Sequence, residues 1–170
     1  MKLEIDDKSL QTINSDDLFL LVVRPIALRM HSGKGPEHKY DVYKSLTDGQ
    51  RAAFMYWVLH SHAADTMQFY TWIPYMRSTE TDYWNQLKKG LQLIDCGEML
   101  QFMDNCDGVF SSLEHAKLDW KAFTPSDLDE PKLKQRIENL YLRLKELSPK
   151  TTAHIGRYIK ANIHDFANVV

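Results

Sequence analysis

Three side chains near the middle of the chain, His60, His62 and Asp65, are of the types that bind metal ions. Zinc-binding histidines on a helix stand four residues apart, whereas residues two apart point about 200° from each other. The spacing therefore favours partly buried, hydrogen-bonded histidines, and we predict neither a metal nor a cofactor. Together with Gln68, these residues could line a pocket, and a His-containing pocket is the basis of one alternative function, that of an undetected hydrolase.

The chain has two cysteines, Cys96 and Cys106. Ten residues apart in a segment that we predict to be helical, they would lie about 15 Å from each other, more than twice the span of a disulfide. A reactive thiol needs a lowered pKa, which the start of a helix can provide. Cys96 precedes a helix that we expect to begin at Gly97, and this is the one hint of an active thiol. Buried, reduced cysteines of a cytoplasmic protein are the simpler interpretation.

Charge is distributed unevenly along the chain. Residues 95–130 contain nine acidic residues against two lysines, a local net charge of −7, and residues 131–160 contain eight basic residues against two glutamates, a local net charge of +6. Carboxylates that approach the charge density of DNA phosphates can bind a basic partner. The acidic residues could form such a patch, or they could be solvated or paired with the neighbouring basic helix. They are Asp95, Glu98, Asp104, Asp107, Glu114, Asp119, Asp127, Asp129 and Glu130.

The basic segment 131–160 does not indicate direct binding to nucleic acid. Its lysines and arginines alternate with a stripe of leucines, and no aromatic stacking platform is interleaved with them. The net charge of −2 for the whole chain offers no global attraction to nucleic acid or to an anionic membrane. The first ten residues lack the apolar core of a signal peptide, and the apolar run 18–28 is too short to span a membrane. We therefore predict a cytoplasmic protein.

The elements that must position these residues are centred on a stretch, residues 50–76, that contains seven of the nineteen aromatic residues. Thr47 and Gln50 form a capping box, which predicts the start of a helix. Residues 52–59 are apolar or aromatic without a polar face, which is typical of a helix buried on nearly all sides. We therefore predict an all-α fold, a single-domain multi-helix bundle around this central buried helix.

The remaining elements follow from helical periodicity and from helix breakers. Apolar residues recur with a period near 3.6 before and after residues 95–97, which predicts two helices with a brief break. We expect the first helix to be kinked or split at Pro25 and residues 31–38 to form a loop. A later helix should end at Ser148–Pro149, before a last helix begins at Thr151 or Thr152. No strand alternation of useful length is present.

Three stretches resemble, in order and spacing, the segments of one protein family. Met67–Tyr70 is similar to an aromatic QFFYN-type segment, Gln86–Cys106 to a pair of helices with a short break, and Tyr158–Phe166 to a closing YIxAHxxxF helix. The family is the bacterial DNA-mimic protein-like domain family, and the resemblance covers roughly residues 49–166. Where members carry Asn-Gly-Gly before the aromatic segment, this chain has Ala63-Ala64-Asp65. The resemblance implies an all-helical fold without known catalysis and, for the name-giving member, binding to a DNA-binding regulator through an acidic surface.

These observations favour a non-enzymatic protein-binding module with a polar lead over residues 1–14 and one helical domain over residues 15–170. Its predicted partner is another protein, such as a DNA-binding regulator, bound through the acidic residues of segment 95–130. An immunity-type, toxin-neutralising protein is the first alternative, motivated by the small size and the lack of catalytic motifs. The hydrolase with a pocket near His60 and His62 is the second.

Overall fold

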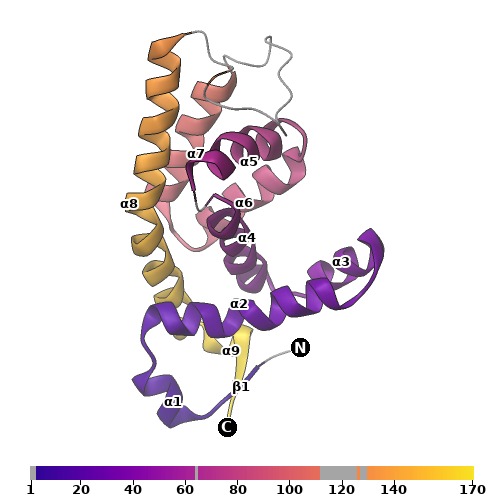
Figure 1. The fold of residues 1–170 in the computed structure, drawn as a ribbon. Coiled ribbons are helices and arrows are strands. Elements are labelled where there is room, and N and C mark those ends of the chain that lie inside the picture. The colour runs from indigo at the N-terminus through magenta and orange to yellow at the C-terminus, as the bar shows by residue number, and fades with distance from the viewer. Residues whose placement is uncertain (1–2, 64, 112–125, 127–129) are drawn as a thin grey trace.

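The computed structural model describes residues 3–63, 65–111, 126 and 130–170, and it confirms the all-α, multi-helix fold class (Figure 1). Among the described residues, two three-residue strands pair as a small sheet, and the other elements are helices. None of these helices combines the length and the apolar character needed to cross a membrane. In chain order the elements are β1 (Leu3–Ile5), α1 (Asp7–Thr12), α2 (Ser15–Ser32), α3 (Gly35–Lys44), α4 (Asp48–His62), α5 (Thr66–Ser78), α6 (Thr81–Leu93), α7 (Gly97–Phe110), α8 (Pro131–Ala161), α9 (Ile163–Phe166) and β2 (Ala167–Val169).

Helix α8 is the longest of these elements, and much of the fold is assembled along it. In Figure 1 it runs down one side of the molecule, with α7 beside it and α2 crossing its C-terminal part. Helices α4 and α6 pack against each other, and α4 also contacts α2. One hydrophobic cluster joins these helices and takes buried side chains from every described helix except α3. A second, smaller cluster lies where α3 meets α2 and α4.

Helix α4 is the buried central helix that the sequence predicts. Its capping box is formed: the Thr47 hydroxyl accepts from the Gln50 N–H at 3.2 Å, and the Gln50 side chain accepts from the Thr47 N–H at 3.1 Å. Tyr56 and Leu59 are fully buried, and burial of a large apolar side chain contributes about 1.5–3 kcal/mol. The Tyr56 hydroxyl donates to the backbone carbonyl of Ser148 at 2.9 Å and so ties α4 to α8.

Two helix crossings are close because a glycine stands at the point of contact. A Cβ added to Gly156 in α8 would lie 2.0 Å from the backbone carbonyl oxygen of Ser15 at the start of α2. A Cβ added to Gly90 in α6 would lie 2.9 Å from the Cα of Ala52 in α4. Non-bonded atoms do not approach this closely, so only glycine lets these helices cross at the observed distance.

The two ends of the described chain lie side by side, which corrects the prediction that strands are absent (Figure 1). Strand β1 pairs with β2 in parallel, with Ile5 opposite Val169, and the N–H of Val170 donates to the Ile5 carbonyl at 3.0 Å. Three residues are too few for an alternating pattern to be recognised in the sequence. Within the predicted lead, residues 1–14, the side chains of Ile5 and Leu10 lie in the core.

Two predicted helix boundaries are wrong because packing outweighs the effect of proline and glycine. Helix α8 runs through Pro149, where the sequence predicts its end. Helix α2 continues through Pro25, which excludes the split but not the kink that the sequence predicts there. The predicted loop 31–38 is partly helical, since α3 begins at Gly35 with a proline in its first turn, where no helical hydrogen bond is lost. A proline inside a helix costs about 3 kcal/mol, and buried side chains on both sides of each proline offset this cost.

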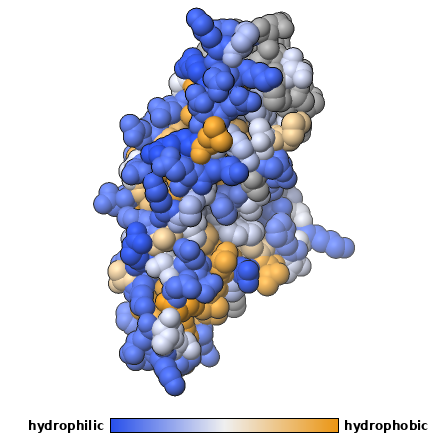
Figure 2. All heavy atoms as spheres, turned by 60° about the vertical axis from the view of Figure 1, so that its left-hand side comes forward, coloured by the Kyte–Doolittle hydropathy of each residue, from blue (hydrophilic) through white to orange (hydrophobic). Residues whose placement is uncertain are grey.

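The surface of the molecule is mostly hydrophilic on the face that Figure 2 shows, with hydrophobic residues gathered in its lower half, at the height of α2 in Figure 1. Helix α2 has more apolar residues than one buried face can hold. Its buried face includes Phe19 and Val23, whereas Leu28 on the same helix is 72% exposed. The outer side of α2 therefore carries an exposed leucine among polar residues such as Asp16 and Arg24.

Candidate functional site

The break between α6 and α7, which the sequence predicts, is a turn with a defined hydrogen-bond pattern. The N–H of Cys96 donates to the Leu91 carbonyl at 2.8 Å, and the N–H of Asp95 donates to the Gln92 carbonyl at 3.1 Å. These are the two bonds of a Schellman motif, which ends a helix with one residue in the left-handed conformation. Asp95 adopts this conformation, with a φ of 55°, and aspartate tolerates it better than most residues. The chain therefore turns sharply, and α7 begins at Gly97.

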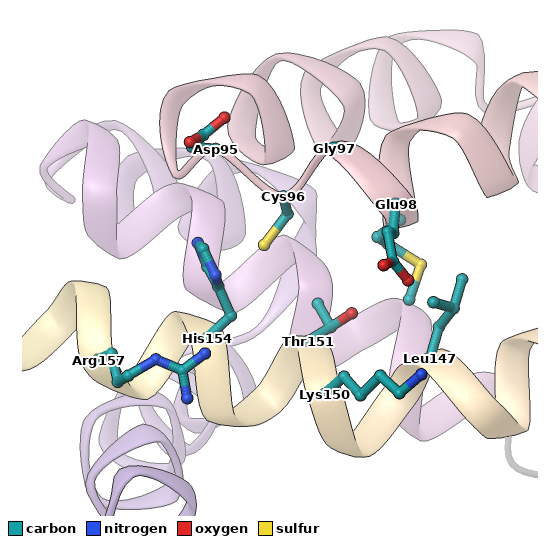
Figure 3. Close-up of a pocket in the computed structure, with 10 residues that line it drawn as sticks. Asp95, Cys96, Gly97, Glu98, Leu147, Lys150, Thr151, His154 and Arg157 are labelled. Carbon is teal, nitrogen blue, oxygen red and sulfur yellow. The ribbon is translucent and has the colours of Figure 1, made fainter.

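A cavity of about 210 Å³ lies between this turn and the middle of α8 (Figure 3). One wall is the turn with the first residues of α7, and the other is one face of α8. In Figure 3 the thiol of Cys96 and the carboxylate of Glu98 point toward α8, whereas the carboxylate of Asp95 points away from it. The residues that line the cavity are Asp95, Cys96, Gly97, Glu98, Met99, Leu147, Lys150, Thr151, His154 and Arg157.

His154 connects the two walls of the cavity. Its Nε2 donates to the carbonyl oxygen of Ile94, the last residue before the turn, at 2.7 Å. Because a carbonyl oxygen can only accept, Nε2 carries a hydrogen, and Nδ1 is the acceptor in the neutral imidazole. The bond satisfies a backbone group at the end of α6 and fixes the position of the turn relative to α8.

Cys96 is not an activated thiol, which corrects the hint given by its position at the start of a helix. The residue is 7% exposed, and burial raises the pKa of its thiol to about 12. The Asp95 carboxylate contributes to this rise, and the Arg157 guanidinium opposes it. Cys106 is fully buried, which raises its pKa well above the ordinary value, and the two thiols form no disulfide. At neutral pH both thiols are protonated and are poor nucleophiles.

A chain of ion pairs runs from α7 along α8 at the edge of the cavity. Glu98 pairs with Arg143 at 3.2 Å. Arg143 also pairs with Glu146 at 2.7 Å, and Glu146 pairs with Lys150 at 3.0 Å. The hydrogen bond from Arg143 is the main cause of the lowered pKa of Glu146, and the same bond raises the pKa of Arg143. The charges of Glu98 and Lys150 at the cavity are therefore already paired with opposite charges of the chain.

Two charged residues of the cavity, Arg157 and Asp95, form no ion pair with any described residue, and both are exposed. The backbone N–H groups at the start of α7 receive no side-chain capping bond from the N-cap residue, Cys96. Such groups carry partial positive charge. The cavity can therefore hold an acidic group near Arg157, and the exposed Asp95 carboxylate, which points away from α8, can contact a basic group outside the cavity.

Two of the acidic residues predicted to bind a partner, Asp104 and Asp107, belong to an ion-pair network within the chain. Asp107 on α7 accepts from the Arg77 Nε at 2.8 Å, from the Trp84 Nε1 at 3.0 Å and from the Lys88 Nζ at 3.0 Å. Lys88 also pairs with Asp104. Because Arg77 belongs to α5 and the other two donors to α6, this network fixes α5, α6 and α7 relative to one another.

Three of the five described acidic residues of segment 95–130 are thus ion-paired within the chain, and Glu130 is exposed at the start of α8. The pair between Glu98 and Arg143 is the pairing with the basic helix that the sequence left open. The other four predicted residues, Glu114, Asp119, Asp127 and Asp129, lie outside the described residues. One continuous acidic surface therefore stays a prediction.

The four residues of the predicted His-containing pocket make different contacts in the structure. His60 lines a cavity of its own with residues of α8. The ring of His62 stacks on that of Trp72 with centroids 5.3 Å apart, and Asp65 caps α5 by accepting from the Gln68 N–H at 2.8 Å. In the described parts of the chain, no three potential metal ligands come close enough to hold an ion.

The fold and the cavity define an all-helical domain with a charged cavity between two of its helices. Comparison with known proteins returns no match: no family model fits the chain, and no curated protein and no solved structure is significantly similar to it. The resemblance to the DNA-mimic protein-like domain family therefore stays a prediction from the sequence.

Sequence reasoning missed the α8 wall of the cavity. Lys150, Thr151, His154 and Arg157 occupy positions i, i+1, i+4 and i+7, which share one helix face. This group of polar residues, which follows Leu147 of the apolar stripe, is the sequence signal that could have revealed the α8 wall. The predicted helix end at Pro149 concealed the signal, because the spacing has this meaning only in an uninterrupted helix.

Proposed function

We propose that this chain is a cytoplasmic, non-enzymatic protein-binding module that contacts its partner over the surface around the cavity between α7 and α8. The supporting observation is that Arg157 and Asp95, exposed beside this cavity, form no ion pair with any described residue. An arginine of this kind can bind a carboxylate through two parallel hydrogen bonds, and arginine is enriched among the residues that dominate interface energetics. A nearby charge of opposite sign restricts the orientation of the partner.

The test replaces each of the two charged residues by an uncharged polar residue of similar size. Asp95→Asn is suitable because asparagine also tolerates the left-handed conformation of the turn. Arg157→Gln is matched by Arg24→Gln, which changes an exposed arginine on α2 that makes no ion pair with any described residue. Each variant serves as bait in an extract of host cells, and captured proteins are quantified by mass spectrometry.

We expect the wild type and Arg24→Gln to capture one protein in equal amounts. Asp95→Asn and Arg157→Gln should each capture less of it. Loss of a charge-assisted hydrogen bond costs about 1.5–3 kcal/mol, which lowers affinity about 10- to 150-fold. Equal capture of every protein by all four baits would show that this surface is not the contact site.

We further propose that the partner is a DNA-binding regulator, on the basis of the family resemblance and the acid-rich segment 95–130. Charge reversal at Asp104 or Asp107 is a poor test, because these carboxylates bind Lys88 and help to hold α5, α6 and α7 together. Competition is cleaner: duplex DNA should release the captured partner if the acidic surface occupies its DNA-binding face. A partner that binds DNA and this chain simultaneously would contradict this part of the proposal alone.

A further inference from the structure

A second cavity, of about 250 Å³, lies between the C-terminal end of α4 and the segment of α8 that contains Pro149. It is separate from the charged cavity, with which it shares no lining residue. The residues that line it are His60, Ala63, Leu144, Lys145, Ser148 and Pro149. Half of these are apolar and one is a histidine that the sequence singles out, so the cavity has a small apolar surface with a few polar groups.

Ser148 gives this cavity an available hydroxyl. The residue is only 8% exposed, and its side chain makes no hydrogen bond of ordinary distance and angle to any described residue, although the hydroxyl lies near that of Tyr56. Ser78, by contrast, follows the usual helical pattern and donates to the carbonyl of Pro74 one turn earlier at 2.7 Å. Buried polar groups are nearly always bonded, so a hydroxyl left over beside a cavity is suited to a ligand.

Two further groups beside Ser148 are uncharged hydrogen-bonding groups. Pro149 has no N–H, so the backbone carbonyl of Lys145 cannot receive the helical bond from that residue. His60 is exposed overall, but partial desolvation lowers its pKa and favours the neutral imidazole, a donor and an acceptor at once. Lys145 is the one residue of the lining with a permanent charge. Its ammonium group lies 5.6 Å from the ring centroid of Tyr141 and interacts with that ring.

We propose that this cavity binds a small uncharged molecule that carries a primary carboxamide beside a short apolar group. The carboxamide oxygen would accept from the Ser148 hydroxyl, and its NH₂ group would donate to the imidazole of His60 or the carbonyl of Lys145. The apolar part would lie against Ala63, Leu144 and Pro149. A carboxylate of the same shape can accept but cannot donate, so the cavity should discriminate between the two.

The probes are propionamide and propionate, which have nearly the same size and differ in charge and in hydrogen-bond donors. Each is titrated into ¹⁵N-labelled full chain, and backbone amide resonances are followed by NMR. We expect propionamide at millimolar concentrations to produce saturable shifts confined to residues 60–63 and 144–148. Propionate should produce weaker shifts there.

Ser148→Ala is the decisive variant, and Ser61→Ala is its control, since Ser61 is exposed and donates to the Val58 carbonyl away from the cavity. Loss of one neutral hydrogen bond should weaken propionamide binding about three- to tenfold. The melting temperature should change little, because Tyr56, whose hydroxyl lies near that of Ser148, keeps its hydrogen bond to the backbone carbonyl of Ser148. Equal binding of propionate, unchanged affinity in Ser148→Ala, or a melting temperature lowered by this substitution would each overturn the proposal.

Discussion

The crossing of α2 over α8 depends on the absence of a single methyl group at Gly156. In Gly156→Ala the new Cβ would lie 2.0 Å from the backbone carbonyl oxygen of Ser15, and an ordinary contact begins near 3.4 Å. The two helices would therefore have to separate locally by about 1.4 Å. A flexible side chain cannot relieve this clash, because the atom that is met belongs to the backbone. The same crossing also buries apolar residues from both helices in the main hydrophobic cluster.

The expected cost follows from two opposing effects. Overpacking costs about 1–3 kcal/mol, and a backbone contact this short belongs at the upper end of that range. Replacing glycine by alanine inside a helix returns about 1 kcal/mol. The net loss for Gly156→Ala is therefore about 2 kcal/mol. Gly108→Ala in α7 is the matched control: no described atom lies within 4 Å of its added Cβ, so it should gain about 1 kcal/mol.

The free energy of unfolding of both variants can be measured by urea titration, and the melting temperature by heating, each followed by far-ultraviolet circular dichroism. For a chain of this size, a loss of about 2 kcal/mol lowers the melting temperature by about 4–8 °C. The m-value should not change, since the same surface is exposed on unfolding. A Gly156→Ala variant as stable as the wild type, or a Gly108→Ala variant destabilised to the same extent, would refute this account of the crossing.

Asp107→Asn should lower the free energy of unfolding by about 1–3 kcal/mol, less than for a fully buried pair because the side chain is 33% exposed. The control Asp16→Asn, in the first turn of α2, should lower it by less than about 1 kcal/mol, the contribution of an exposed acid to the helix dipole. Both thiols should react with an aromatic disulfide reagent only after unfolding, because burial raises the pKa of Cys96 to about 12 and that of Cys106 well above its ordinary value; rapid reaction of the native protein at neutral pH would contradict this. Partial desolvation lowers the pKa of His60, so the unfolded chain binds the proton more readily, and a small part of the stability should be lost as the pH falls through the ordinary histidine pKa toward the folded value, small because the residue is exposed overall. His60→Gln should flatten that part of the stability curve, and an NMR titration of His60 with a midpoint above about 6.5 would refute the assignment.

The candidate site shows how far sequence reasoning could go. The turn that forms one wall was predictable, because the period of the apolar residues breaks at Asp95 and a short local hydrogen-bond pattern makes the turn. The other wall was not predictable once α8 was expected to end at Pro149. Only a continuous helix places Lys150 and Arg157 on one face, and its continuity depends on packing that residues nearby in sequence do not reveal.

The sequence by itself determined the helical class, the buried central helix and the start of that helix at Thr47, because capping and amphipathic periodicity involve residues within about four positions. Tertiary structure alone decided which charges remain free and which thiols can ionise. Glu98 meets Arg143 across 45 residues of sequence, and the Tyr56 hydroxyl meets the Ser148 carbonyl across 92. Electrostatic pairing and desolvation depend on distance in space, so these properties are fixed only when the helices pack.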